Sequence, residues 1–108
     1  MRKLLYAMGV RFRVGNRDLP GSPDIANRTG RWAIFVHGCF WHAHRDCPRA
    51  TVPKRNRAFW VAKFTANRAR DRRVLLELNR LGYRTLVVWE CDAKRPEVIE
   101  RRLRRFLD

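Results

Sequence analysis

WAIFVHGCFWHAHRDC, residues 32–47, is the stretch of sequence that decides the fold. Its first five residues, 32–36, are an apolar run that predicts a central β-strand. Residues 35–47 hold all three histidines and two of the three cysteines of the chain, together with Phe40 and Trp41. Hydrophobic patterning alone does not explain so many metal-ligand side chains in one segment. We therefore interpret it as a functional site that follows the end of a strand.

The elements expected around this stretch alternate between helix and strand. In chain order, the pattern predicts a helix end at 1–9, a half-buried strand at 10–14, a loop at 16–23, a short strand at 24–26, a hairpin turn at 27–30, the central strand, a helix at 56–81, a strand at 84–89 and a helix at 96–107. This order is typical of an α/β domain with a mixed sheet. Cys91 and the cysteines of residues 35–47 both follow apolar strands, so one edge of the sheet should gather them.

The composition favours a polyanionic partner. Lys and Arg number 25 against 10 Asp and Glu, which gives a formal net charge of +15 over 108 residues. A field of this sign attracts nucleic acid above all. The chain has no apolar run of membrane-spanning length and no signal-peptide pattern, so we expect a cytoplasmic protein and no membrane partner. Cytoplasmic thiols are normally reduced, which favours metal ligation or burial over disulfides.

The three cysteines and one histidine provide a set of soft metal ligands. Three thiolates and one imidazole match the donor set of closed, tetrahedral structural zinc sites, and the residues concerned are Cys39, His44, Cys47 and Cys91. Their spacing is wider than that of the usual zinc knuckle. The alternative is that the cysteines are simply buried without a metal.

Asp24, His37 and His42 suggest a second kind of site. Asp24 precedes a short strand that a tight turn would place beside the end of the central strand. A carboxylate there, with a backbone carbonyl, could hold Mg²⁺ at a phosphate, and a nearby imidazole could deprotonate the attacking water. The plainer interpretation is that both histidines are structural and Asp24 is a turn residue.

Two further features fit a nucleic-acid ligand but have ordinary explanations. Phe40 and Trp41 are consecutive, so one ring should point away from the core, where it could wedge between bases; core packing is the alternative. The basic runs at 49–57 and 68–73 are either solvated faces or phosphate contacts. Asn67 and Asp71 continue the apolar stripe of the 56–81 helix, so they either support the structure or face a site.

Several segments together resemble the very short patch repair (Vsr) DNA mismatch endonucleases. The matching segments are LPGSPD at 19–24, FVHGCFWHAHRDC at 35–47, VP at 52–53, FW at 59–60, NRARDRR at 67–73 and LGYRTLVVWEC at 81–91. They cover most of the chain from residue 10 onward. HGCFWH followed by a histidine, a cysteine and a later VWEC is a specific combination.

The resemblance implies a restriction-endonuclease-like fold and a nick made 5′ to the thymine of a T:G mismatch, the product of 5-methylcytosine deamination. It implies that Asp24 and the Val36 carbonyl bind Mg²⁺, that His42 is the general base, and that His37 is a second histidine at the phosphate. Zinc would be bound by Cys39, His44, Cys47 and Cys91. The implied DNA-binding residues are Phe40, Trp41 and Trp60, which would intercalate, and Asn67, Asp71 and Arg72.

The resemblance also sets expectations for the whole protein. Residues 1–108 would form a single endonuclease domain that lacks the family's N-terminal helix. We expect a monomer that acts on double-stranded DNA near the bacterial nucleoid, with mismatch-repair proteins as candidate partners. The first alternative is a shortened, non-catalytic, zinc-containing DNA-binding module. The second is an RNA-associated zinc protein, which would leave Asp24, His37 and His42 without a role.

Overall fold

Three strands form one mixed sheet at the centre of the protein. The computed structural model describes residues 1–41, 44–45, 47–48 and 50–108. β1 (Ile25–Asn27) pairs antiparallel with β2 (Trp32–His37), and β2 pairs in parallel with β3 (Arg84–Trp89). The expectation of an α/β protein with a mixed sheet is confirmed.

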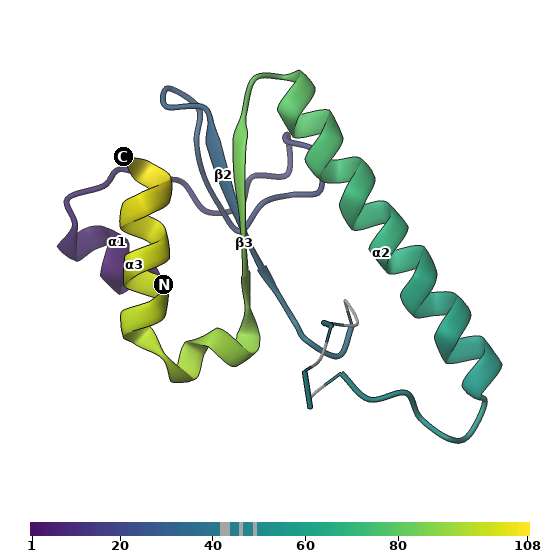
Figure 1. The fold of residues 1–108 in the computed structure, drawn as a ribbon. Helices are drawn as coiled ribbons and strands as arrows, with labels where there is room; N and C mark the ends of the chain where they lie inside the picture. The colour runs from purple at the N-terminus through teal and green to yellow at the C-terminus, as the bar shows by residue number, and fades with distance from the viewer. Residues whose placement is uncertain (42–43, 46, 49) are drawn as a thin grey trace.

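The helices lie on both faces of this sheet. α2 (Arg57–Arg80) covers one face, while α1 (Arg2–Ala7) and α3 (Pro96–Leu107) lie together on the other, as Figure 1 shows. A short 3₁₀ helix, η1 (Glu90–Lys94), joins β3 to α3. No helix in the described part of the chain has both the length and the apolar character needed to cross a membrane.

β2 is buried on both faces because its residues alternate between two hydrophobic clusters. Trp32 and Ile34 belong to the cluster beneath α1 and α3, whereas Ala33 and Phe35 belong to the cluster beneath α2. His37 follows the same alternation and is only 8% exposed. The period of the strand therefore places this imidazole on the α2 side.

The strand predicted at residues 10–14 is wrong, apart from a single bridge. Arg13 exchanges both backbone hydrogen bonds with Ala26, at 2.8 and 3.0 Å. β1 has only three residues, and the Arg11 carbonyl accepts a hydrogen bond from the Asn27 side chain instead of joining a ladder. The apolar alternation of this segment reflects the packing of Val10 and Phe12 against the α1 and α3 cluster.

α2 is longer than the sheet that it covers, and its two halves pack against different partners. Leu78, near its C-terminal end, is fully buried against the sheet, and Phe64, near its N-terminal end, is 5% exposed. Figure 1 shows the N-terminal half extending past the strands toward the loop that leaves β2. The inward stripe predicted from the sequence is present, and Asn67 and Asp71 lie on it half-buried.

Replacement of Leu78 by alanine should destabilise the fold, because it leaves a cavity between α2 and the sheet. We expect a loss of about 2–5 kcal/mol in the free energy of unfolding, measured by urea denaturation. Leu76→Ala is the matched control, since Leu76 lies on the same helix but is 53% exposed. Equal effects of the two substitutions would contradict the packing described.

Candidate active site and metal centre

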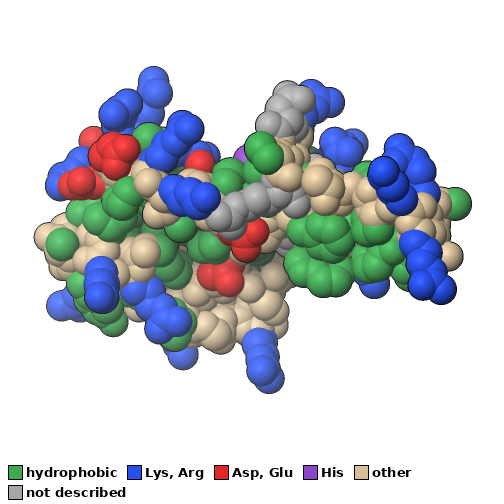
Figure 2. Space-filling view, turned by 90° about the horizontal axis from the view of Figure 1, so that it is seen from below, with side chains coloured by type: hydrophobic (Ala, Val, Ile, Leu, Met, Phe, Trp, Pro, Cys, Tyr) green, Lys and Arg blue, Asp and Glu red, His purple; other side chains and the backbone are tan. Residues whose placement is uncertain are grey.

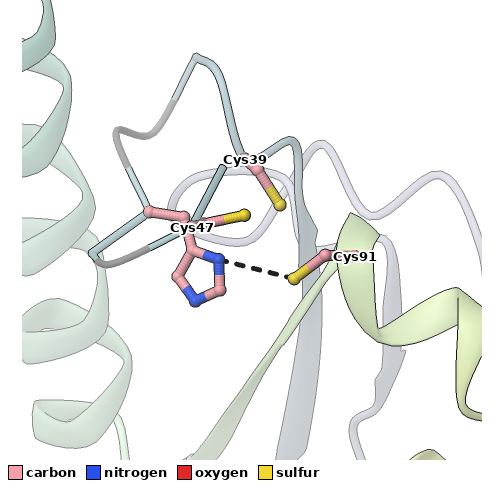
Figure 3. A group of neighbouring side chains, drawn as sticks. Cys39, Cys47 and Cys91 are labelled. Atoms are coloured by element: carbon pink, nitrogen blue, oxygen red, sulfur yellow. Dashed lines mark hydrogen bonds between the residues drawn. The ribbon is translucent and has the colours of Figure 1, made fainter. Parts of the chain in front are cut away.

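The four predicted metal ligands lie together at one edge of the sheet. Parallel pairing matches His37 with Trp89, so the chain leaves β2 and β3 at the same end. Figure 3 shows Cys39 and Cys47 on the loop after β2, with Cys91 facing them from the chain that follows β3. The ligand atoms of Cys39, His44, Cys47 and Cys91 all lie within 4.8 Å of one another.

The spacing and chemistry of this cluster fit a soft divalent cation. His44 Nδ1 lies 3.5 Å from Cys91 Sγ, and ordinary zinc bond lengths put an S···N edge of a tetrahedral site at about 3.6 Å. Burial, with the Cys39 and Cys47 thiols nearby, raises the pKa of Cys91 to about 11. The metal-free thiol is therefore protonated at neutral pH, and a bound cation must displace its proton.

A second group of predicted residues lines a cleft beside this cluster. The cleft has a volume of about 450 Å³, and four of the predicted residues border it: Asp24, Val36, His37 and Asp71. They come from the loop before β1, from the end of β2 and from α2. His42, the predicted general base, lies outside the described residues.

Asp24 is held against β2 by the backbone. Its Oδ2 accepts a hydrogen bond of 2.6 Å from the Val36 N–H, so the short hairpin brings the carboxylate to the end of the central strand as expected. Asp24 is solvent-exposed, and Val36 is 41% exposed beside it. A fixed, hydrated carboxylate next to open space is a suitable partner for Mg²⁺, which keeps several of its waters.

The loop before Asp24 is packed closely against α2. Gly21 has a φ of +71°, and a Cβ built on it would lie 2.4 Å from Val74 Cγ1. Both the left-handed backbone and the contact require glycine at this position. This approach forms one wall of the cleft, since Gly21 and Val74 both line it.

Trp89 connects the metal cluster to the cleft. Its ring stacks on the His44 ring at 4.0 Å with an interplanar angle of 8°, and it meets the His37 ring edge-on at 5.2 Å. No role for Trp89 is evident from the sequence alone. Strand alternation in β3, which puts Val87 and Trp89 on the α2 side, is the signal that could have found it.

Five aromatic rings gather where the loop after β2 meets the N-terminal half of α2. The Phe40 ring packs against the rings of Phe64 and Trp60, with ring centroids 5.1 and 5.8 Å away. Phe40 is therefore the inward member of the Phe40 and Trp41 pair. Trp41 is 52% exposed, as expected for the other member. Asn67 Nδ2 holds this loop by donating to the Trp41 carbonyl at 2.9 Å. Phe59, which is 59% exposed, is the fifth ring and was not singled out from the sequence.

Positive charge surrounds the end of the molecule that carries these groups. Figure 2, seen from that end, shows Lys and Arg side chains around the rim and hydrophobic side chains between them. Arg70 lines the cleft, and Arg45, Arg68 and Arg72 line a neighbouring hollow of about 420 Å³ that shares His37 and Asp71 with it. Such a surface can bind a polyanion across the cleft.

The chain is similar to known proteins over most or all of its length. Residues 1–49 match the family model described as DNA mismatch endonuclease Vsr. The chain is 45% identical over 108 residues to the type II nicking enzyme V.XorIIP of Xanthomonas oryzae pv. oryzae, an alignment that covers 100% of this chain and 79% of the relative. It is 37% identical over 107 residues to the type II nicking enzyme V.NmeAIP of Neisseria meningitidis, and this alignment covers 99% of the chain and 76% of the relative. It is 45% identical over 97 residues to the DNA mismatch endonuclease Vsr of Escherichia coli, and this alignment covers 90% of the chain and 62% of the relative.

Removal of one cluster ligand should lower both metal content and stability. For Cys91→Ser we expect less than one bound metal ion per chain, and a melting temperature lower by more than about 10 °C, because binding energy at a structural site is also folding energy. Metal analysis and thermal denaturation measure the two effects. Lys94→Ala is the control, since this exposed residue lies three positions from Cys91. Unchanged metal content and stability in Cys91→Ser would contradict the assignment.

Proposed function

Because this chain belongs to the Vsr family of DNA mismatch endonucleases, we propose that it nicks duplex DNA 5′ to the thymine of a T:G mismatch by Mg²⁺-dependent hydrolysis. That the protein is a DNA endonuclease follows from the family. The mismatch, the position of the nick and the metal are the proposed parts. The observation that carries them is the convergence of Asp24, Val36, His37 and Asp71 on one cleft within a basic surface.

The predicted active-site residues divide the hydrolysis between them. Asp24 would hold the cation through its carboxylate, whose orientation is fixed by the Val36 N–H, and the Val36 carbonyl would be the second protein ligand. When bound, Mg²⁺ supplies the charge that polarises the scissile phosphate. His42 takes a proton from the attacking water. His37 contacts the phosphate from the α2 side, where Phe35 and Trp89 restrain its ring.

We propose zinc as the metal of the cysteine and histidine cluster. The ligands are Cys39, His44, Cys47 and Cys91, a set without an open position for substrate. Zinc here has a structural role: it ties the loop after β2 to the start of η1. The aromatic rings and the cleft then keep a fixed relation to each other.

Three rings of this aromatic group are the proposed mismatch wedge. Phe40, Trp41 and Trp60 would enter the base stack beside the T:G pair, because apolar side chains inserted between base pairs unstack them and kink the duplex. Support comes from the half-exposed Trp41 ring, which lies 6.2 Å from the Trp60 ring. Asn67, Asp71 and Arg72 would lie along the DNA, with Asn67 also holding the Trp41 carbonyl.

The remaining proposals concern the protein as a whole. A mixed sheet with Asp24 at the entry to β1 supports a restriction-endonuclease-like fold over residues 1–108. We also propose that the enzyme is monomeric and works at the bacterial nucleoid, in the cytoplasm, with mismatch-repair proteins as candidate partners.

The direct test is a nicking assay on T:G, C:G and A:T duplexes with Mg²⁺. We expect a single nick in the thymine strand of the T:G duplex alone. Asp24→Asn should abolish the nick because it removes the metal-binding charge, and His42→Ala should slow it by about 10²–10⁴-fold. Glu97→Gln, which neutralises an exposed carboxylate on α3, is the matched control and should cleave normally.

A duplex that is bound but left intact by the wild-type protein would sink the proposal. That outcome would favour the non-catalytic DNA-binding module instead. Preferential binding of single-stranded RNA would favour the RNA-associated alternative.

The wedge is tested by truncating one ring. Trp41→Ala should weaken binding to the T:G duplex by about 1–3 kcal/mol, because stacking of one base on one ring has this magnitude. Tyr6→Ala is the control: Tyr6 is an aromatic residue that is 70% exposed on α1, across the sheet from the loop. Fluorescence anisotropy of labelled duplexes measures both affinities. Equal affinities of wild type and Trp41→Ala would contradict a wedge role for Trp41.

A further inference from the structure

We propose that Asn16 is a positioning residue for Asp24, a role that rests on the proposed function of Asp24 as the Mg²⁺ ligand. Asn16 lies in the loop between the Arg13 bridge and β1, and only 1% of its surface is exposed. A buried amide in a loop of polar, proline and glycine residues must use its hydrogen-bonding groups, or it destabilises the fold. Its partners indicate what it holds in place.

The Asn16 side chain uses both its donor and its acceptor atoms. Nδ2 donates to the carbonyls of Arg13, at 2.9 Å, and Pro23, at 3.1 Å. Oδ1 accepts a hydrogen bond of 3.0 Å from Arg28 Nη1. Two acceptors on one side and a guanidinium on the other match an amide in one orientation only. An aspartate of the same size could accept from Arg28 but could not donate to the carbonyls.

The Pro23 carbonyl belongs to the peptide unit that leads directly into Asp24. Pro23 is itself fully buried, so this peptide plane is fixed by the Asn16 amide on one side and by packing on the other. Two residues later, Ala26 exchanges two hydrogen bonds with Arg13. The Asp24 carboxylate accepts from the Val36 N–H. The Asp24 backbone is thus held both before and after the residue that must present its carboxylate to the metal.

Arg28 extends this network to the hairpin turn between β1 and β2. Besides Asn16, its guanidinium binds the carboxylate of Asp18 with two nitrogens. The hydrogen bond from Arg28 also holds the pKa of Asp18 below its usual value. Asn16 therefore ties the two ends of its loop together, and the Arg28 guanidinium ties that loop to the hairpin.

A positioning role differs from simple loop support in what it affects. Loss of a fixed Pro23–Asp24 peptide should raise the metal concentration needed at the site while DNA binding through the basic surface and the rings is kept. A purely structural role would lower the melting temperature and reduce activity by the same factor at every Mg²⁺ concentration. The dependence on metal concentration separates the two roles.

The test compares Asn16→Asp with Asn79→Asp, the same substitution at an exposed position near the C-terminal end of α2. The first measurement is the rate of T:G nicking across Mg²⁺ concentrations, with duplex affinity measured separately. For Asn16→Asp we expect half-saturation at a Mg²⁺ concentration roughly tenfold higher, duplex affinity within about twofold of wild type, and partial recovery of the rate at high Mg²⁺. Asn79→Asp should match wild type. An unchanged half-saturation, or a loss that is equal at all Mg²⁺ concentrations, would overturn the proposal.

The second measurement does not depend on cleavage. Mn²⁺ added to the ¹⁵N-labelled protein should broaden the Asp24 and Val36 amide resonances, and Asn16→Asp should need several-fold more Mn²⁺ for the same broadening. If the wild type fails to nick the T:G duplex but shows this broadening, the proposed mismatch-nicking function fails and the titration still decides the role of Asn16. If Mn²⁺ leaves the Asp24 resonance of the wild type unchanged, the positioning role is overturned as well.

Arg28→Ala covers the case in which Asn16→Asp does not fold. This variant leaves both hydrogen bonds donated by Asn16 Nδ2 in place and removes the partner of Oδ1, together with the ion pair between Arg28 and Asp18. We expect a smaller shift in the same direction, about two- to threefold in the Mn²⁺ needed, because the amide is less restrained. An Arg28→Ala protein with wild-type Mn²⁺ dependence would contradict the network.

Discussion

The parallel pairing of β2 with β3 is the constraint on which the rest of the structure depends. It sets His37 opposite Trp89 and makes both strands end at one edge of the sheet. Cys39 and Cys91, which are far apart in sequence, therefore meet, and His44 and Cys47 join them at the start of η1. A one-residue slip of β3 against β2 would turn Trp89 away from α2 and separate it from His37 and from the cluster.

A second, shorter pairing supplies the other half of the site. The β1 and β2 hairpin carries Asp24 to the end of the central strand, where the Val36 N–H donates a hydrogen bond to its carboxylate. α2 contributes to both parts of the site: Asp71 lines the cleft, and Asn67 donates a hydrogen bond to the Trp41 carbonyl in the loop after β2. Zinc, in the proposed function, does no chemistry of its own; it keeps the loop, the rings and the cleft in one geometry.

The sequence predicted what depends on periodicity and residue type. β3 and α3 begin and end where expected, and the four cluster residues meet as their positions after two strands suggested. The prediction was wrong where the structure of a segment depends on a partner segment from elsewhere in the chain. Alternation at residues 10–14 looked like a strand, but the three-residue β1 offers room for only one bridge. The alternation of β3 gives the side of the sheet on which Trp89 lies, but not its place between two histidines. No local pattern marks the burial of Asn16, which depends on long-range packing.

Two separate metal sites with different duties are the central claim. Anomalous diffraction from crystals of the protein with a T:G duplex and Mn²⁺ tests it most directly, with data recorded at the zinc and manganese edges. We predict a zinc peak enclosed by Cys39, His44, Cys47 and Cys91, and a distinct manganese peak between Asp24 and the phosphate 5′ to the mismatched thymine. A single metal peak at the cysteine cluster, with none at Asp24, would contradict the claim.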